Sequence, residues 1–414
     1  MRKVSENSQH GKFNVVEYKR WKVFNLCSQL RFSMKSLAFI SFTLSSVYLV
    51  QAVALKPSFN SLNRRYPRKI GKRCTGTISS LDDVDSAQEC TTIVIDAFTV
   101  DAGETFTLNP PDGATVTMKG NITFSFKEWD GPLMVVKGND ITFDGGGNTL
   151  DGQGEKYWDG KGTSSDGTTK PVPLLRINHD GGSFSNVVVL NSPARAVAIG
   201  GDGVTVSKIT VNNSAGDESN DASDGKPAGH NTDGFDISAN NVVVEDSVVM
   251  NQDDCLAINR GKNITFQNNQ CSGGHGISVG SISSNVVVSN VQITGNTVKD
   301  SMQCFRIKTQ ASASNSTVSG ITYKGNTGSG CEDYGVLITQ SYPEALGTAG
   351  TGVIISDVTF TGTNTVSVDS GADRVDVNCG STTSCPGTWD FSGLTVTGGD
   401  AGTITNASIS GGSF

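Results

Sequence analysis

Short apolar runs alternate with small and polar residues along most of the chain. From residue 92 onward, runs rich in Val, Ile, Thr and Phe are separated by Gly, Asn, Asp and Ser, which predicts β-strands joined by turns. The segment 80–90 differs, because Ser80 is followed by two acids, Asp82 and Asp83, as at the start of a helix. We therefore expect a short helix over 80–90, with Ser80 as its N-cap, that covers one end of a sheet structure.

The runs recur at a nearly constant spacing. Runs that open with asparagine begin at Asn241, Asn263 and Asn285, each 22 residues after the last. A second family of runs begins at Gly234, Cys255, Gly276, Phe305 and Gly335, at steps of 21, 21, 29 and 30 residues. A period this short cannot hold a propeller blade, and without helices it cannot form a helical solenoid. It predicts a right-handed parallel β-helix with one turn per repeat.

The recurring asparagines support this fold. Asparagine at the same corner of successive turns suits left-handed turn positions and side-chain ladders between turns. The alternative is an irregular β-sandwich, but a sandwich does not require constant spacing. No domain break is visible after residue 74, so we expect one β-helix domain over residues 74–414.

Composition and charge narrow the function classes. The chain has 49 Gly but only 11 Pro among 414 residues, which excludes collagen and proline-rich disorder. Residues 1–73 hold 15 of the 32 Lys and Arg and two of the 40 acids, so the remainder has a formal net charge of −21. Such a surface repels polyanions at long range, which argues against nucleic acid as a partner. An anionic ligand would need a local cluster of cations.

The basic front end has the features of a targeting region. Residues 34–54 contain Met34, a lysine, an apolar stretch and a small-residue exit, as in a secretory signal peptide. Residues 1–33 would be an N-terminal extension; Met34 is an alternative start, and a cytosolic tail on a signal anchor is another alternative. Serine and threonine interrupt the apolar run, which falls short of the ~20 residues of a membrane span. We expect cleavage, basic-pair processing of a propeptide over 55–73, and a secreted, extracellular protein with no membrane attachment that begins at Cys74.

Cysteine usage agrees with an oxidising compartment. Of nine cysteines, only Cys27 lies upstream of residue 74, which leaves an even eight. Zinc or free thiols are the alternative, but no paired C-x-x-C is present, so disulfides are favoured. Proximity along the chain suggests the pairs Cys74–Cys90, Cys255–Cys271, Cys304–Cys331 and Cys379–Cys385. Sequons for N-glycosylation stand at Asn121, Asn212, Asn263, Asn315 and Asn406.

Acidic residues coincide with one edge of the repeats. Asp233, Asp254 and His275 each stand one residue before a run of the second family. Since rungs of a parallel stack lie ~4.8 Å apart, we expect these three side chains to form one ladder. Asp253 is one residue out of phase, so its side chain should enter the same area from another angle.

Cations lie on the next rungs. Arg306 and Lys308 are two residues apart on a strand and share a face, and Tyr334 stands at the ladder position one rung further. Close acids flanked by cations suggest hydrolysis of an anionic polysaccharide, in which one carboxyl group protonates the leaving oxygen and another activates water. A calcium-dependent lyase would also use clustered acids, but it would leave Gly274-His275-Gly276 without a role.

Ordered motifs carry a specific resemblance. They are Asn231-Thr-Asp-Gly-Phe-Asp236, Asn251-Gln-Asp-Asp-Cys255, Gly273-Gly-His-Gly276 and Arg306-Ile-Lys308, with Tyr157-Trp-Asp-Gly160, Asp333-Tyr-Gly335 and Thr397-Gly-Gly399 in addition. Over nearly all of 74–414 the chain resembles the polygalacturonases, the pectin-cleaving inverting glycoside hydrolases, and most closely the fungal endo-acting enzymes. The resemblance implies a right-handed parallel β-helix with a long cleft that cuts α-1,4-linked galacturonan by single displacement.

The resemblance also implies roles for the matching residues. Asp253 would be the general acid, while Asp233 and Asp254 hold and activate the water and His275 tunes the acid. The substrate-binding residues would be Asn231, Gln252, Arg306, Lys308 and Tyr334. No metal or cofactor is expected, and we expect a monomer whose partner is pectin or polygalacturonan. An exo-acting or rhamnogalacturonan-directed relative and a non-catalytic galacturonan-binding protein remain alternatives.

Inversion makes a geometric demand on these carboxyl groups. Inverting enzymes place the acid and the base ~6.5–9.5 Å apart, against ~5–5.5 Å in retaining enzymes. We therefore expect the out-of-phase Asp253 to stand at the longer separation from Asp233 and Asp254.

Overall fold

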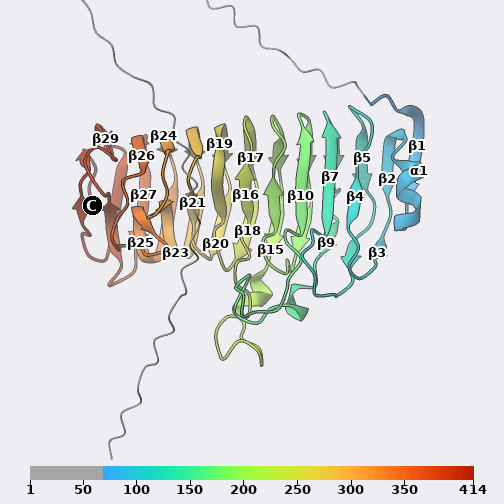
Figure 1. The fold of residues 1–414 in the computed structure, drawn as a ribbon, viewed down its shortest axis with the longest axis horizontal. Coiled ribbons are helices and arrows are strands. Elements are labelled where there is room, and N and C mark those ends of the chain that lie inside the picture. Colours follow the sequence, from blue (N-terminus) through green and yellow to red (C-terminus); the bar gives the residue numbers. More distant parts are fainter. Residues whose placement is uncertain (1–68) are drawn as a thin grey trace, which may run out of the picture. The chain divides into compact units, whose positions relative to one another are not determined.

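The computed structural model describes residues 69–414, so the predictions for 1–33 and 34–54, and those for most of 55–73, lie outside the described residues. Residues 69–414 form a solenoid of parallel strands, in which each turn pairs with the turn before it and the turn after it (Figure 1). The predicted right-handed parallel β-helix is confirmed. The strands form three stacks.

Stack 1 runs from the first strand to the last. Its strands are β1 (Lys72–Ile78), β2 (Cys90–Ile95), β5 (Thr115–Met118), β8 (Thr142–Asp144), β11 (Ser183–Ser185), β14 (Thr205–Ser207), β17 (Val242–Glu245), β19 (Leu256–Gln267), β22 (Val287–Thr294), β24 (Ser316–Lys324), β26 (Val353–Thr361), β29 (Thr388–Asp390) and β32 (Ser408–Ser410). The predicted start at Cys74 lies inside β1, in which Lys72 is already paired with Cys90.

Stack 2 carries the acidic motifs. It contains β4 (Phe106–Leu108), β7 (Met134–Asn139), β10 (Leu175–Asp180), β13 (Val197–Ile199), β16 (Phe235–Ser238), the first half of β19, β21 (Ile277–Ile282), and the second halves of β23 (Thr297–Gln310) and β25 (Thr327–Tyr342), then β28 (Asp373–Asn378) and β31 (Ile404–Thr405).

Stack 3 completes each turn. It contains β3 (Phe98–Val100), β6 (Ile122–Phe124), β9 (Thr149–Asp151), β12 (Val188–Leu190), β15 (Thr210–Asn212), β18 (Val248–Asn251), β20 (Gln270–Gly273), the first halves of β23 and β25, β27 (Asn364–Val368) and β30 (Leu394–Thr397). Because β19, β23 and β25 bend through two stacks, the later turns are continuous strands.

A short helical segment covers the first turn. It consists of the 3₁₀ turn η1 (Leu81–Asp83) and helix α1 (Val84–Ala87), whose Val84 and Ala87 are buried. The helix is shorter than the predicted 80–90, because Cys90 pairs with β1 and opens β2. Ser80 precedes the helix but makes no side-chain cap; instead its hydroxyl donates to Asp83. Among residues 69–414, no helix is long and apolar enough to cross a membrane.

The interior is a continuous column of Val, Ile, Leu and Phe side chains. Aromatic rings stack between neighbouring turns, with centroids 4.3 Å apart for Phe143 and Phe184 and 4.4 Å apart for Tyr323 and Phe360. Such rings bury large apolar areas and favour offset stacking. The inward positions of each strand therefore hold the solenoid together, and the outward positions of stack 2 are left for chemistry.

The corner asparagines have the predicted left-handed conformation, but not all in the predicted register. Asn241, Asn263 and Asn285 have φ of 57°, 57° and 63°. The amide of Asn263 donates to Asn241, and the next rung of this ladder is Asn290, whose amide donates to Asn263. The equivalence of Asn285 with Asn263 is wrong, because Asn285 belongs to the ladder of Asn315. The turn after Asn263 is five residues longer than the turn before it, since Ile264 pairs with Val242 and Val291.

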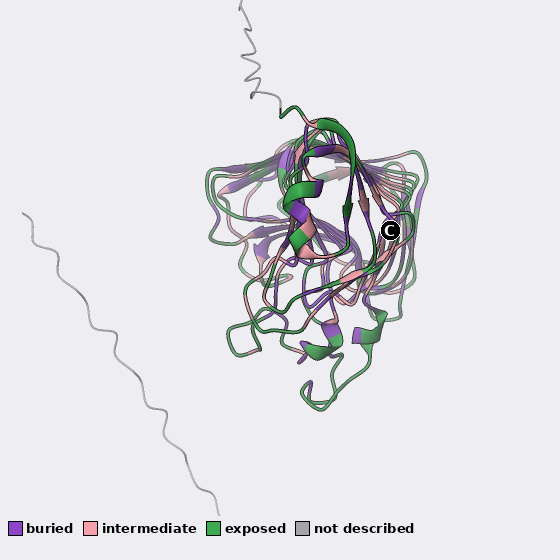
Figure 2. Cartoon of the chain, turned by 90° about the vertical axis from the view of Figure 1, so that its right-hand side faces the viewer, coloured by how far each residue is buried: buried purple, intermediate pink, exposed green. Residues whose placement is uncertain are grey.

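Long insertions interrupt the regular turns on one side. They lie between β9 and β10 and between β15 and β16, and include the 3₁₀ turns η2 (Gly154–Lys156) and η3 (Ser214–Asp217). Both project beside the strands (Figure 2). The second is largely exposed, whereas the first buries Tyr157, Trp158, Asp159 and Lys170. They dock on each other, since the Gly160 amide donates to the carbonyl of Ala228 at 2.9 Å. They form a wall next to stack 2.

The disulfides follow the suggested pairs. They join Cys74 to Cys90, Cys255 to Cys271, Cys304 to Cys331 and Cys379 to Cys385. Of the sequons, Asn121, Asn263, Asn315 and Asn406 are exposed and Asn212 is partly buried.

Candidate active site

Polar side chains replace apolar ones on the outer face of stack 2. Asp236, Ala257, Ser278 and Arg306 occupy the same outward position on successive strands. Above this face lie two adjoining cavities of about 320 and 340 Å³. Both are lined by Asn231, Asp253, Lys308 and Tyr342. We call these two cavities together the cleft.

The predicted ladder is present at the edge of the cleft. Phe235 pairs with Leu256, and Leu256 with Ile277, so the preceding residues Asp233, Asp254 and His275 are equivalent. The runs that begin at Gly276 and Phe305 were expected to align. Instead Phe305 pairs with Ile277, so the next strand is shifted by one residue. The fourth ladder residue is therefore Gln303, which pairs with Tyr334, the fifth ladder residue, as predicted.

Asp254 is held by side chains from neighbouring strands. Its Oδ1 accepts from Nη2 of Arg306 at 2.5 Å and from the Ser278 hydroxyl at 2.8 Å, and its Oδ2 accepts from Nζ of Lys308 at 2.6 Å. All three charged side chains are buried. The two cations, expected to meet substrate, are thus also the direct partners of Asp254.

Asp253 has a different set of hydrogen-bond partners from Asp254. Its Oδ1 accepts from the backbone N–H of Asp254 at 2.7 Å and lies 3.0 Å from Nδ1 of His275, and its Oδ2 accepts from the Asn231 amide at 2.9 Å. Burial opposes ionisation, but the hydrogen bond and charge of His275, the charge of Lys308 and the backbone N–H outweigh it. They hold the pKa of Asp253 well below its usual range. The free protein therefore carries Asp253 as an ion beside His275.

The pKa values of two neighbouring carboxyl groups, Asp233 and Asp236, are shifted in the opposite direction. Burial, followed by the negative charges of Asp253, Asp236 and Asp254, raises the pKa of Asp233 well above its usual value. Burial also raises the pKa of Asp236 to about 6, although Arg195 and a hydrogen bond from Asn259 lower it. The pKa values of Asp233 and Asp236 are thus shifted upward, whereas that of Asp253 is shifted downward.

Comparison with known proteins identifies the family. The profile of the glycosyl hydrolases family 28 matches residues 90–411. The chain belongs to glycosyl hydrolase family 28. Endopolygalacturonase A of Aspergillus niger is 41% identical over 337 residues, which cover 80% of this chain and 88% of that one. A probable endopolygalacturonase I of Aspergillus flavus is 42% identical over 336 residues, with the same coverage.

Comparison with solved structures supports the same family. Endopolygalacturonase I from Stereum purpureum, determined with two galacturonates, is 51% identical, with a TM-score of 0.77 over 82% of this chain and 99% of that chain. The polygalacturonase of Erwinia carotovora ssp. carotovora, at 18% identity and a TM-score of 0.57, covers 84% of this chain and 99% of that one and shows the shared fold. The resemblance to the polygalacturonases is confirmed.

The carboxyl spacing of this family 28 protein is shorter than expected. One atom each of Asp253, Asp254 and His275 lies within 4.8 Å of the others. Asp253 and Asp254 are adjacent on one turn, which brings their nearest oxygens closer than the ~6.5–9.5 Å typical of inversion. The expected long separation is wrong for this pair, so carboxyl spacing alone does not decide the stereochemistry.

This group also resembles the donor set of a metal site, but its surroundings do not. Both oxygens of Asp254 already face cations, Arg306 and Lys308. A metal ion would meet two positive charges within the same contacts and would have to displace them. The residues present fit an ion-pair cluster better than a metal centre.

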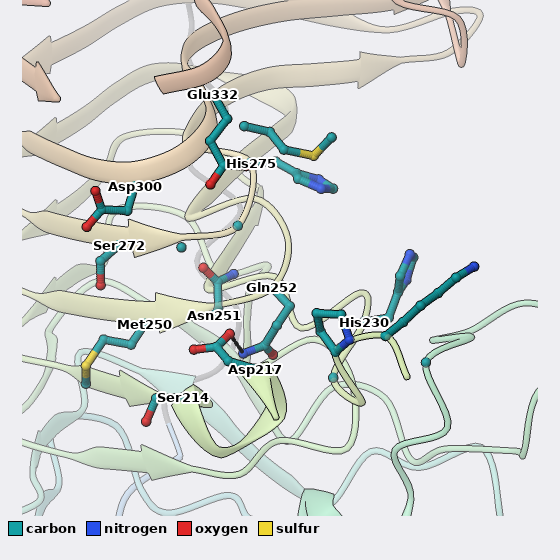
Figure 3. A pocket seen from close by; sticks show the side chains of 17 residues that line it. Ser214, Asp217, His230, Met250, Asn251, Gln252, Ser272, His275, Asp300 and Glu332 are labelled. Carbon is teal, nitrogen blue, oxygen red and sulfur yellow. Dashed lines mark hydrogen bonds between the residues drawn. The ribbon is translucent and has the colours of Figure 1, made fainter. Parts of the chain in front are cut away.

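Gln252, predicted to bind substrate, lies outside the cleft. Its Nε2 donates to the Asn213 carbonyl and to Asp217, and its Oε1 accepts from the Thr232 hydroxyl, so its polar atoms already have protein partners. It lines a third cavity of about 650 Å³ together with Asp300 and Glu332 (Figure 3), and this cavity shares His230, His275 and Met302 with the second cavity of the cleft. Its hydrogen bonds fix η3 to the active-site turn.

Asn231 and Tyr334 do line the cleft. Asn231 has a φ of 52° and holds Asp253 directly. Tyr334 stands in the cavity beyond His275, where burial and the nearby acids Asp376, Asp333 and Asp373 raise its pKa.

Sequence reasoning missed several residues of the cleft, among them Tyr342, Asp236 and Arg195. Asp236, within the first motif, faces the cleft beside Arg195, whose Nε lies 3.8 Å from its Oδ2. Arg195 occupies the ladder position one turn before Asp233, since Val197 pairs with Phe235. That turn is 38 residues long because of the insertion, so the constant spacing could not reveal it. For Asp236, the available signal was its place in the first motif, three residues after the ladder residue Asp233.

Proposed function

We propose that this protein hydrolyses internal α-1,4-galacturonosidic bonds of polygalacturonan, the backbone of pectin. The observation that carries the proposal is the meeting of three carboxyl groups with Arg306 and Lys308 where the two cavities of the cleft join. Relatives at 41–42% identity named endopolygalacturonases support the substrate. Cations in an otherwise acidic protein provide the local attraction that a polyanion requires.

The extent of the cleft favours endo action. One cavity continues from the carboxyl groups toward Arg195 and Asn259, and the other continues toward Tyr334 and Glu344. Sugar units of a chain can therefore occupy both sides of the reacting bond, whereas an exo-acting enzyme needs one side closed. The carboxyl groups stand at the junction, so the cut falls within the chain.

The proposed mechanism is a single displacement with inversion. Asp253 gives a proton to the leaving glycosidic oxygen, while Asp254 and Asp233 hold a water molecule and take up its proton as its oxygen attacks the anomeric carbon. In the free protein the pKa of Asp253 is lowered, and Nδ1 of His275 lies 3.0 Å from its Oδ1. We propose that His275 supplies the proton that Asp253 donates, and that the proton taken up by the base returns through solvent.

Arg306, Lys308 and Tyr334 complete the proposed site. Their groups line the cavity beyond His275, where they can meet galacturonate carboxylates next to the reacting bond. Since Arg306 and Lys308 also neutralise Asp254, they couple substrate binding to the base. Charge-assisted hydrogen bonds of this kind are the strong ones in proteins.

The test is hydrolysis of de-esterified polygalacturonate followed by reducing-end release, viscosity and product size. Early loss of viscosity with mixed oligomers is expected. Monomer release with little loss of viscosity would point to exo action, cleavage of rhamnogalacturonan alone would point to that relative, and binding without cleavage would point to a non-catalytic protein. Proton NMR of the first product should show inverted anomeric configuration, and retention would overturn the mechanism.

We also propose that the protein acts outside the cell as a secreted monomer. The support is the signal-like segment 34–54, the even set of paired cysteines and the exposed sequons. Processing at Cys74 would remove the first two residues of β1 but leave the pairs from Thr75 to Ile78 and the disulfide to Cys90. N-terminal sequencing and intact mass of the secreted protein test the start and the glycans, and sedimentation tests the monomer.

A further inference from the structure

The wall beside the cleft contains a loop that is fastened by a buried ion pair. Lys170 donates from Nζ to Oδ1 of Asp159 at 2.9 Å, and the two side chains are only 1% and 9% exposed. The same carboxylate accepts from the backbone N–H groups of Lys161 and Thr168, at 3.0 and 2.7 Å. Asp159 therefore closes the segment 161–168 on itself. Against burial, hydrogen bonds from the backbone N–H of Thr168, from Lys170 and from the backbone N–H of Lys161 lower the pKa of Asp159 to about 2.

The closed segment reaches the active site at one residue. The backbone N–H of Thr163 donates to Oδ1 of Asn231 at 3.0 Å, and its hydroxyl lies 3.2 Å from the same oxygen. On its other side, Asn231 donates from Nδ2 to Oδ2 of Asp253 at 2.9 Å. The two residues Thr163 and Asn231 are 68 positions apart in the chain, and they meet only because the insertions dock.

The chemistry of these contacts fixes which way the Asn231 amide points. A backbone N–H can only donate, so the Asn231 atom that faces Thr163 must be the carbonyl oxygen. The NH₂ group must then face Asp253. Without Thr163 the amide could rotate and turn its oxygen toward Asp253, where two acceptors would repel each other.

We propose that the segment 161–168 is a positioning element for the catalytic acid, which sets the Asn231 amide and through it holds the Asp253 carboxyl. Thr163 lines the first cavity of the cleft, but its hydrogen bonds go to Asn231 and not to the acid. It acts through Asn231, and the ion pair of Asp159 and Lys170 keeps it in place. This inference rests on the proposed function in one respect, the role of Asp253 as the acid.

Other charged groups surround Asp253, and they influence its pKa in addition to the hydrogen bond from Asn231. Those that bear on its charge or line its cavities come from each neighbouring element: His275, Lys308, Arg306, Asp254, Asp233, Asp236, Arg195, His230, Asp333 and Glu344. None of them belongs to the segment 161–168. The hydrogen bonds of that segment therefore reach Asp253 through Asn231, and among these groups a Cβ at Gly162 would meet the His230 ring.

Loss of the Asn231 hydrogen bond has a sign that can be measured. The bond favours the ionised carboxylate, so its loss makes Asp253 hold its proton to higher pH. Because an acid must be protonated to act, the alkaline limb of the kcat profile should then move to higher pH. A purely structural defect would lower kcat at every pH and leave the limb where it was.

Gly162 offers a direct test with a matched control. It has a φ of 58°, and a Cβ at this position would overlap Oδ1 of Asn231 and lie 2.6 Å from Nδ1 of His230. Gly225, in the neighbouring insertion, has a φ of 78° and nothing within 4 Å of its would-be Cβ. Gly162→Ala and Gly225→Ala thus carry similar backbone strain, but only the first displaces Asn231.

The experiment is the pH dependence of kcat on polygalacturonate. We expect Gly162→Ala to lower kcat about tenfold and to move the alkaline limb upward by about half a pH unit or more, and Gly225→Ala to match the parent. In an Asn231→Ala background, Gly162→Ala should add almost nothing, because both act on one contact. An unmoved limb, or effects that simply add, would overturn the proposal.

A second variant covers the case in which Gly162→Ala does not fold. Asp159→Asn combined with Lys170→Met removes the ion pair without leaving a lone buried charge, and it should move the limb in the same direction. If that protein is folded and its limb is unmoved, the proposal fails. Full activity of Asp253→Asn would instead defeat the proposed function, while an inactive Asp253→Asn beside a normal Gly162→Ala would defeat only the positioning role.

Discussion

Two adjacent carboxyl groups, Asp253 and Asp254, are held by different parts of the molecule. Asp254 faces Arg306, Lys308 and Ser278, which project from consecutive strands of stack 2. Asp253 is held by Asn231, at a left-handed turn after an insertion, and by His275. The strand side gives a fixed geometry, because its spacing is that of the β-ladder. The insertion side depends on loop contacts and can be adjusted without altering the solenoid.

Replacing the carboxyl groups themselves should lower turnover more than replacing the residues that hold them. Asn at Asp253 removes the proposed proton donor, and Asn at Asp254 removes the water-holding carboxylate, so each should cut turnover by roughly 10²- to 10⁴-fold. Both should retain the parent far-ultraviolet circular dichroism. Asn at Asp233 should behave in the same way. Near-normal kcat for Asp253→Asn would contradict the assignment of the acid.

The strand side can be weakened at its cations. Arg306→Gln or Lys308→Gln removes one charge-assisted contact of about 1.5–3 kcal/mol, so kcat/KM should fall roughly 10- to 100-fold. Because both cations also pair with Asp254, part of the loss should appear in kcat and part in KM. Ser278→Ala, which removes a neutral hydroxyl that bridges Asp254 and Arg306 but no charge, is the control and should cost less. Unchanged kcat/KM in both cation variants would refute their role.

The support of Asp253 can also be weakened at His275, which comes from the regular ladder and not from an insertion. His275→Gln removes the hydrogen bond and charge that lower the pKa of Asp253, so the acid should stay protonated to higher pH. We expect kcat at the optimum to fall about tenfold and the alkaline limb to move upward. His230→Gln is the comparison, since His230 lines the same cavity without a hydrogen bond to Asp253 in the described structure. A limb that moves equally in both variants would argue against a specific pairing.

The smallest expected effect on activity, but a clear one on stability, comes from Asp159. Its pKa is about 2 when folded and 3.8 in the reference state, so it stabilises the folded form by about 2 kcal/mol above pH 4. That contribution is lost as the pH falls from about 4 to 2. Asp159→Asn should lower the free energy of unfolding at pH 6 and flatten this part of its pH dependence. Urea unfolding at pH 6 and pH 3 would measure both, and a parent-like pH dependence would contradict the assignment.

Much of the fold and part of the site could be predicted from the chain itself. Inward apolar positions repeat wherever turns have equal length, so the β-helix and the ladder of Asp233, Asp254 and His275 follow from spacing alone. The same counting failed for Asn285 and for the phase at Phe305, where the turns lengthen. A period can be read only while it is constant.

The amino-acid sequence by itself determined the solenoid, the family and which residues stand at the edge of the cleft, because strand register is a local property that repeats. Only the tertiary structure decided which partner each acid has. It placed Arg306 and Lys308 on Asp254, gave the polar atoms of Gln252 protein partners, and brought Arg195 and Thr163 to the cleft. Thr163 lies in the first insertion and Arg195 on the turn before the second. Their contacts depend on how loops of unequal length pack, and such packing produces no periodic pattern in the sequence.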